Sequence, residues 1–221
     1  MTESHSDTIR ENYDRLAEEY ARRVFDELAH KPADRALLDR FADSTAGRGA
    51  VCDLGCGPGH VARYLHEAGA DAFGLDLSPQ MLAQARRLNP HLLFVQGDMT
   101  ALPLADASLA GVTAFYAIVN LPPSIHPTVF REIARVLQPG GLVLLAFHMG
   151  NEQLDVKELM GLPITMGFHL LDPAKISAGL AETGLQIEDV VTREPYAPDV
   201  EYQSRRAYVF ARKPLRPPNP S

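Results

Sequence analysis

The 221-residue chain has no tryptophan, only two cysteines and few aromatic residues, and it contains no apolar run long enough to cross a membrane. Cys52 and Cys56 are the only thiols, and their spacing fits neither a disulfide loop nor a zinc site, so no metal is expected. Two unpaired thiols and no signal-peptide pattern predict a cytoplasmic protein that does not engage a membrane.

Positive charge is also scarce. The chain has 21 Lys and Arg residues against 28 Asp and Glu, which gives a formal net charge of −7. Nucleic-acid binding normally requires a basic patch, so a nucleic-acid partner is unlikely. The hydrophobic share of 46% is ordinary for a globular protein, and the length allows one domain with a full core.

Three glycines lie close together in one short segment of the chain. Residues 51–59 read Val-Cys-Asp-Leu-Gly-Cys-Gly-Pro-Gly, and a helical pattern begins directly afterwards at His60. Glycines at every second position let the backbone turn sharply and let a ligand approach the main chain. A turn of this kind between a strand and a helix predicts a nucleotide-type ligand site in an open parallel sheet.

Carboxylates stand at the ends of three consecutive predicted strands. These are Asp53, Asp76 and Asp98, and Asp76 lies about 20 residues beyond the glycine turn, where an acid can hold ribose hydroxyls. Ligands bind outside the carboxyl ends of such strands, so these acids are expected to line one crevice. A dinucleotide is disfavoured because His60 stands where its fingerprint needs a third glycine. An acidic crevice suits a positively charged sulfonium better than a phosphate.

Four segments in order resemble the class I S-adenosylmethionine-dependent methyltransferases, over about residues 45–148. They are residues 53–59, 74–78, 97–99 and 135–141. The resemblance implies S-adenosylmethionine as cofactor and S-adenosylhomocysteine as product. It places Asp53, Gly55, Cys56 and Gly57 near the methionine part, Asp76 at the ribose, Leu77 and Met99 around adenine, Asp98 at its amine, and Phe115 and Tyr116 below the cofactor. Taken singly, the acids could be turn or cap residues, and Leu77 and Met99 could be core residues.

The alternation of strands and helices predicts an α/β doubly wound, mostly parallel seven-stranded sheet, with the last strand antiparallel as in that family. Residues 1–43 are expected to form an N-terminal helical cap, 44–213 the main domain with a lid insertion at 149–171, and 214–221 a disordered proline-rich tail. Strands are expected at 50–54, 71–76, 92–96, 108–118, 142–147, 186–193 and 205–212. Helices are expected at 8–30, 32–42, 60–68, 79–89, 127–137 and 173–183.

The first helix carries two tyrosines on one face. Tyr13 and Tyr20 lie seven residues apart, and the segment around them resembles the YDxxAxxY pattern that closes over the cofactor in small-molecule members of the family. The resemblance therefore adds both to the cofactor site. The same periodicity also fits a stripe of packing residues.

Methyl transfer from a sulfonium needs a general base only when the acceptor arrives protonated. His148 follows the fifth strand and is the acid/base candidate, with Glu152 and Asp155 as alternatives. A structural hydrogen-bonding role for this histidine is the competing interpretation. The loop at 194–206 carries tyrosines, acids and two arginines, and it could bind a polar substrate, including a carboxylate, or be an exposed connection.

These observations point to transfer of a methyl group to an O, N or C atom of a small molecule, by a monomer or homodimer. The alternatives are methylation of a protein or RNA group and a non-catalytic cofactor sensor. Residues 120–123 read Asn-Leu-Pro-Pro, which departs from the pattern of adenine amino-methyltransferases at this strand end. That departure weakens the nucleic-acid alternative further.

Overall fold

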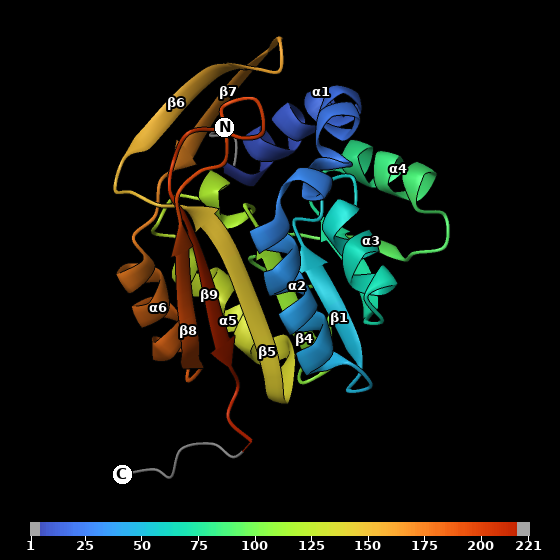
Figure 1. Cartoon of the computed structure of the whole chain (residues 1–221), viewed down its shortest axis with the longest axis vertical. Helices are drawn as coiled ribbons and strands as arrows, with labels where there is room; N and C mark the ends of the chain where they lie inside the picture. The colour runs from blue at the N-terminus through green and yellow to red at the C-terminus, as the bar shows by residue number, and fades with distance from the viewer. Residues whose placement is uncertain (1–4, 216–221) are drawn as a thin grey trace.

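The computed structural model describes residues 5–215, and its main feature is a sheet in the order β3-β2-β1-β4-β5-β9-β8 (Figure 1). All neighbouring strands pair in parallel except β9, which is antiparallel to both β5 and β8. This confirms the doubly wound seven-stranded sheet with one reversed strand. The strands are β1 Ala50–Leu54, β2 Asp71–Asp76, β3 Phe94–Gln96, β4 Leu109–Phe115, β5 Leu137–His148, β8 Gln186–Arg193 and β9 Arg206–Arg212.

Helices cover both faces of this sheet (Figure 1). They are α1 His5–Val24, η1 Glu27–His30, α2 Pro32–Thr45, α3 His60–Glu67, α4 Pro79–Leu88, η2 Ile118–Asn120, α5 His126–Val136 and α6 Pro173–Glu182. Local signals set several starts: the Ser78 side chain accepts a hydrogen bond from the backbone N–H of Met81, and Pro79 opens α4. Asp172 caps α6 in the same way.

Strand β5 shows how the sheet separates two cores. Leu142, Leu144 and Ala146 belong to the cluster that includes side chains of α2 and α3. The alternate residues Val143, Leu145 and Phe147 belong to the cluster that includes α5 and α6. Side chains on a strand alternate between faces, so an unbroken apolar run is what a strand covered on both sides requires.

The insertion after β5 is a β-hairpin. Strands β6 (Gln153–Leu159) and β7 (Leu162–His169) pair antiparallel and stand with α1 above the carboxyl ends of the sheet strands (Figure 1). The Asn12 side chain joins the two elements, because it donates to the Thr165 carbonyl at 2.9 Å and accepts from the Thr165 N–H at 3.2 Å. The sequence indicated an insertion here but not its secondary structure.

Several element boundaries differ from the sequence expectation. The first helix ends at Val24, with a separate 3-10 turn reaching His30. Strand β4 ends at Phe115 rather than 118, because Tyr116 takes a left-handed backbone with φ of 54°. Strand β5 begins at Leu137 instead of 142, and Gly140, with φ of 77°, lets it continue through the expected helix stop. Of the expected 214–221 tail, residues 216–221 lie outside the described residues.

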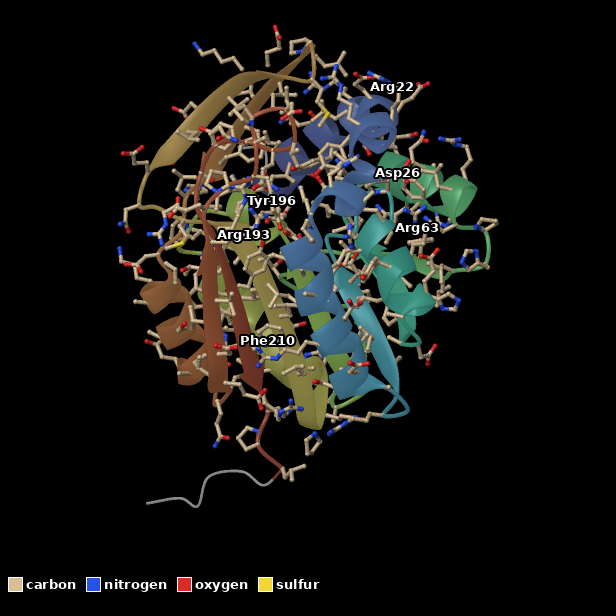
Figure 2. All side chains as sticks on the ribbon, viewed as in Figure 1. Arg22, Asp26, Arg63, Arg193, Tyr196 and Phe210 are labelled. Carbon is tan, nitrogen blue, oxygen red and sulfur yellow. The ribbon has the colours of Figure 1, made fainter. Side chains whose placement is uncertain are left out.

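Guanidinium groups that stack on aromatic rings join the N-terminal segment to the rest of the fold. Figure 2 labels Arg63, Asp26 and Phe210, which take part in these contacts. Arg63 on α3 lies 4.0 Å from the Phe25 ring centroid and 3.4 Å from the Asp26 carboxylate. Arg40 on α2 lies 4.1 Å over the Phe210 ring on β9. Within residues 5–215, no helix is both long and apolar enough to span a bilayer.

Candidate functional site

The glycine turn after β1 forms one wall of the site. Gly55, Gly57 and Gly59 have φ values of 71°, 51° and 81°, a region that other residues rarely adopt. The N–H groups of Gly55 and Cys56 both donate to the Leu75 carbonyl, at 2.7 and 3.1 Å. A Cβ at position 55 would lie only 2.5 Å from the Ala117 Cβ. The turn therefore requires glycine for both its backbone angle and its close packing.

Replacing Gly55 with Ala is expected to lower the free energy of unfolding by about 1–3 kcal/mol, because the new methyl group overlaps Ala117 and the φ is strained. Gly69→Ala is the control, since Gly69 also has a positive φ of 92° but nothing within 4 Å of its would-be Cβ. Urea unfolding of both variants separates crowding from backbone strain. Equal losses in the two variants would show that the packing at position 55 contributes nothing.

Asp76 ends β2 directly beside this turn. One carboxylate oxygen accepts from the Gly57 N–H at 2.8 Å, and the other accepts from the Ser78 N–H at 2.8 Å. Burial raises the pKa of Asp76, while these backbone hydrogen bonds act in the opposite direction. Each carboxylate oxygen can accept a further hydrogen bond, so the group can still bind a diol.

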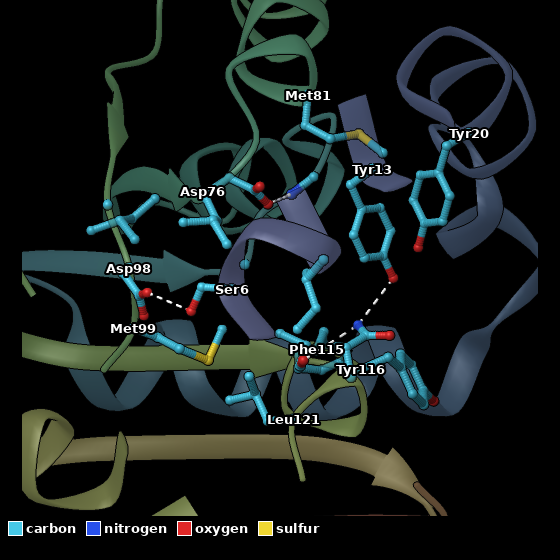
Figure 3. A pocket seen from close by; sticks show the side chains of 18 residues that line it. Ser6, Tyr13, Tyr20, Asp76, Met81, Asp98, Met99, Phe115, Tyr116 and Leu121 are labelled. Carbon is cyan, nitrogen blue, oxygen red and sulfur yellow. Dashed lines mark hydrogen bonds between the residues drawn. The ribbon is translucent and has the colours of Figure 1, made fainter. Parts of the chain in front are cut away.

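An inner pocket of about 80 Å³ opens at this point, between the glycine turn, the ends of β2 and β4 and the first turns of α1 (Figure 3). Ten of the twelve expected cofactor residues line it: Tyr13, Tyr20, Gly55, Gly57, Asp76, Leu77, Asp98, Met99, Phe115 and Tyr116. No lysine or arginine stands among the described residues that line it. The pocket is therefore acidic and apolar, which suits an adenosyl group with a sulfonium better than a pyrophosphate.

Asp53 and Cys56 do not line this pocket. Asp53 is 2% exposed and accepts from the Thr113 hydroxyl at 3.0 Å, and its second oxygen has no hydrogen-bond partner among the described residues. Burial raises the pKa of Asp53 to about 6. The Cys56 thiol is packed against Gly74. Both side chains lie beneath the turn, so a direct ligand contact by either gains no support from the geometry.

The first turn of α1 closes over the inner pocket (Figure 3). The Ser6 hydroxyl donates to Asp98 at 2.9 Å, and His5 Nε2 lies 3.1 Å from the Asn120 carbonyl. Partial burial would raise the pKa of Asp98, but hydrogen bonds from Thr100 and Ser6 outweigh it and lower that pKa. At about 80 Å³ the pocket is smaller than a typical ligand site of about 300 Å³ or more. The first turn of α1 therefore narrows the pocket.

A second, larger cavity of about 450 Å³ adjoins the first. Tyr13, Tyr20 and Tyr116 line both and mark their junction. The β6–β7 hairpin covers one side with Leu154, Val156 and Phe168. This cavity is large enough to hold a small molecule next to the inner pocket.

His148 lines the larger cavity, as expected from its place after β5, whereas Glu152 and Asp155 are exposed and do not line it. Its Nδ1 lies 2.8 Å from the Ser204 hydroxyl. Burial, and then the nearby Arg206 and Lys31, lower the pKa of His148 to about 3. An imidazole with so low a pKa is a poor proton acceptor, so the geometry does not support the expected role as a general base.

This shift predicts a pH-dependent stability. The folded imidazole stays neutral while the unfolded one binds a proton below about pH 6.5, so stability is complete above that pH and is lost as the pH falls toward 3. When the pH is lowered from 7 to 5, the free energy of unfolding of the wild type should fall by about 1–2 kcal/mol more than that of His148→Gln. Urea unfolding at both pH values measures this difference. His30→Gln, at an exposed position, is the control and should behave as the wild type does.

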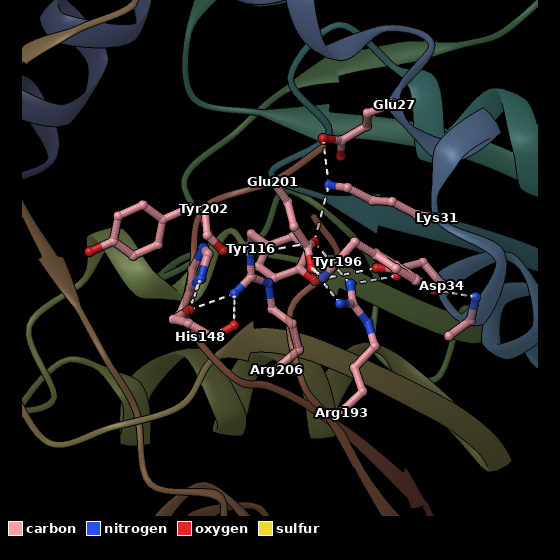
Figure 4. A network of polar contacts seen from close by, with 12 residues as sticks. Glu27, Lys31, Asp34, Tyr116, His148, Arg193, Tyr196, Glu201, Tyr202 and Arg206 are labelled. Carbon is pink, nitrogen blue, oxygen red and sulfur yellow. Dashed lines mark hydrogen bonds and ion pairs between the residues drawn. The ribbon is translucent and has the colours of Figure 1, made fainter. Parts of the chain in front are cut away.

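A largely buried ion network lies next to the larger cavity (Figure 4), and its members Glu27, Lys31, Glu201 and Arg206 line that cavity. Arg193 donates to Asp34 at 2.8 Å and to Glu201 at 2.5 Å, and Arg206 lies 3.4 Å from Glu201. Lys31 donates to Glu27 at 2.7 Å and lies 3.9 Å from Glu201. Glu201 and Arg206 belong to the loop that the sequence marked, but Glu27, Lys31, Asp34 and Arg193 were missed. Arg193 is separated from Asp34 by 159 residues of chain, and no local pattern predicts that they meet.

Comparison with known proteins finds similarity to methyltransferases. Residues 51–141 match the model of a methyltransferase domain. The chain is 41% identical over 117 residues to a malonyl-[acyl-carrier protein] O-methyltransferase of Enterobacter lignolyticus, covering 53% of this chain and 45% of that protein. It is 37% identical over 112 residues to a demethylmenaquinone methyltransferase of Beutenbergia cavernae, covering 51% and 45%. The chain thus spans about half the length of the curated relatives it matches.

Solved structures share the fold at lower identity. A DhpI–S-adenosylhomocysteine complex superimposes with a TM-score of 0.73 at 20% identity, covering 98% of this chain and 100% of that one. The [4+2]-cyclase SpnF superimposes with a TM-score of 0.60 at 20% identity, covering 80% and 81%, so the fold by itself does not decide the reaction. Residues 51–141 therefore match a methyltransferase domain, and the ordered strand-end motifs within this stretch resemble those of the class I S-adenosylmethionine-dependent methyltransferases.

Proposed function

We propose that this protein transfers a methyl group from S-adenosylmethionine to an O, N or C atom of a small-molecule acceptor and releases S-adenosylhomocysteine. The observation that carries the proposal is the convergence of Asp76, Asp98 and the bare backbone at Gly55 and Gly57 on one acidic pocket. That pocket adjoins a larger cavity of about 450 Å³ that an acceptor could enter. S-adenosylmethionine supplies a methyl group bound to a positively charged sulfur, which is activated for displacement.

Different pocket residues would bind different parts of S-adenosylmethionine. In this proposal Asp76 accepts hydrogen bonds from the ribose hydroxyls, and Asp98 accepts one from the adenine amine. Leu77 and Met99 line the same pocket and would pack on the two faces of the base. Gly57 presents backbone to the methionine part without a side chain in the way. A charged carboxylate that accepts such bonds contributes more than a neutral acceptor would.

The protein's main chemical task is alignment, because an in-line displacement depends on holding nucleophile, methyl carbon and sulfur in a line. Tyr13 and Tyr20 pack edge to face at the junction, with centroids 5.9 Å apart and an angle of 83°. Burial raises the pKa of both phenols, so they stay neutral. They can exclude water and fix the direction of approach without moving a proton.

Labelled methyl transfer tests this function. The purified protein is incubated with a cell extract and S-adenosylmethionine that carries a radioactive methyl group, and the labelled product is then sized. Label in a low-molecular-mass fraction supports the proposal. Label in protein or RNA would overturn the small-molecule acceptor, and S-adenosylhomocysteine binding without any transfer would indicate a sensor.

The volume of the larger cavity, about 450 Å³, is in the range of small-molecule sites and supports a small-molecule acceptor. The free, buried Cys52 and Cys56 fit the proposed cytoplasmic location. A monomer or homodimer and the absence of a nucleic-acid partner complete the proposal, the latter supported by the net charge of −7.

A further inference from the structure

We propose that the larger cavity selects an acceptor whose methylated end is an oxygen anion, in the simplest case a carboxylate, and whose body is apolar. The inference rests on the proposed function and specifies its substrate class. It is carried by the arrangement of side chains around Tyr116, at the junction of the two cavities.

Three basic side chains surround the Tyr116 ring. The His148 ring centroid lies 5.0 Å from it, the Arg206 guanidinium 5.6 Å and the Lys31 ammonium 5.8 Å (Figure 4). Tyr116 is held in place by its left-handed backbone and by hydroxyl contacts of 3.3 Å to both Tyr208 and Asp34. Strained backbone outside glycine is concentrated at functional sites. The Tyr116 ring is therefore fixed in position, and together with the basic side chains around it the ring can bind one end of a ligand.

Two cations lie next to His148. Arg206 and then Lys31 act on the imidazole more strongly than Glu201 or Glu27 does. Glu201 is bound by Arg193 at 2.5 and 3.0 Å, and Lys31 is paired with Glu27 at 2.7 Å. The other titratable groups lining the cavity are Glu158 and His169 on the hairpin and the tyrosines Tyr13, Tyr20, Tyr116 and Tyr202. An anion that contacts His148 and Arg206 is therefore favoured there over an ammonium group.

The hydrogen bonds of Ser204 fix what His148 offers to a ligand. The Ser204 hydroxyl oxygen accepts from Arg206 Nη1 at 2.5 Å, so its own hydrogen must go elsewhere. His148 Nδ1 at 2.8 Å is a much better acceptor for it than the Arg205 carbonyl at 3.4 Å. With the Ser204 hydroxyl donating to Nδ1, the Nε2 of His148 carries the proton. His148 thus presents a hydrogen-bond donor, which suits an anionic oxygen.

The rest of the cavity is apolar. Leu154, Val156 and Phe168 line it from the hairpin, and Val119 and Leu170 line it from other elements. An aliphatic or aromatic body buried against these side chains gains hydrophobic stabilisation. The cavity therefore combines a polar end, where Lys31, Arg206 and His148 lie, with an apolar remainder.

A carboxylate also fits the chemistry of the site. One of its oxygens forms a bond to the methyl carbon as the carbon–sulfur bond breaks, and that bond's electron pair remains on sulfur. The carboxylate and sulfonium charges both disappear, giving a neutral ester and a neutral thioether. No proton is released, so no base is required, which agrees with the weakly basic state of His148.

Three ligands that share one chain and differ in head group test this selection. Decanoate, decylamine and decan-1-ol are titrated by calorimetry, below their critical micelle concentrations, into protein saturated with S-adenosylhomocysteine. Decanoate is expected to bind at least about 10-fold more tightly than the other two. Equal or tighter binding of decylamine or decan-1-ol, or no binding of decanoate, would overturn the proposal.

Substitutions in the cavity identify which residues produce the preference for decanoate. Lys31→Met and His148→Phe should each weaken decanoate binding by about 5- to 10-fold and leave decan-1-ol unchanged. Lys157→Met, on the exposed side of the hairpin, is the control and should bind decanoate as the wild type does. If Lys31→Met fails to fold, His148→Phe alone decides the test. An unchanged preference of His148→Phe for decanoate over decan-1-ol would contradict the role of His148 as the hydrogen-bond donor. S-adenosylhomocysteine binding is measured first in each protein, so a failure of the proposed function is seen separately.

Discussion

Asp76→Ala should weaken S-adenosylhomocysteine binding by about 1–3 kcal/mol, because the ligand's ribose loses charge-assisted hydrogen bonds. The carboxylate lies in the inner pocket with each oxygen already oriented by one backbone N–H, at 2.8 Å from Gly57 and from Ser78. Its loss therefore removes both the acceptor and the group that orders the glycine turn. Isothermal calorimetry with S-adenosylhomocysteine measures the change.

The matched control is Asp71→Ala, at the exposed first residue of the same strand. This substitution removes a carboxylate from β2 at a position outside the pocket. The variant's dissociation constant for S-adenosylhomocysteine should equal that of the wild type. Circular dichroism confirms that both variants are folded. An unchanged affinity in Asp76→Ala would show that the end of β2 does not bind the adenosyl group.

Arg193→Met should lower the free energy of unfolding by about 3–5 kcal/mol, because it leaves the buried Asp34 carboxylate without its cationic partner and removes the nearest cation from Glu201. The Arg193 guanidinium is bound by Asp34 at 2.8 Å and by Glu201 at 2.5 Å, and both carboxylate side chains are at most 2% exposed. Methionine fills much of the space of the arginine side chain but carries no charge. Urea unfolding at pH 7 measures the loss.

Arg205→Met is the comparison for this network. Arg205 pairs with Glu194 at 2.9 Å, but the two side chains are 54% and 74% exposed. An exposed pair contributes about 0–1 kcal/mol, so this variant should remain close to the wild type. Similar losses in Arg193→Met and Arg205→Met would mean that burial of the network is energetically unimportant.

The sequence was sufficient for the parts of the site that depend on local pattern. The glycine turn, the strand-end acids Asp76 and Asp98, and the cap at Ser78 are each set by a few neighbouring residues, and all lie where the pattern indicated. Their register follows from parallel pairing, in which Asp76 aligns with Gln96 at the end of β3. The doubly wound sheet followed from the same alternation of strands and helices.

Other parts depend on contacts that no local pattern reveals. Asp53 also ends a strand, but its side chain turns toward Thr113 beneath the pocket. Lys31 reaches Glu201 only because α2 packs against the β8–β9 loop, and Arg193 bonds Asp34 across 159 residues of chain. The role of His148 depended on Ser204, Arg206 and Lys31, whose positions only the folded chain defines.

A crystal structure of the protein with S-adenosylhomocysteine tests the central claim most directly. The account predicts the ribose hydroxyls on Asp76, the adenine ring between Leu77 and Met99, and the sulfur facing the cavity that Tyr13, Tyr20 and Tyr116 share with the inner pocket. Crystals in which the ligand occupies another surface, or in which Asp76 and Asp98 make no contact with it, would contradict the account.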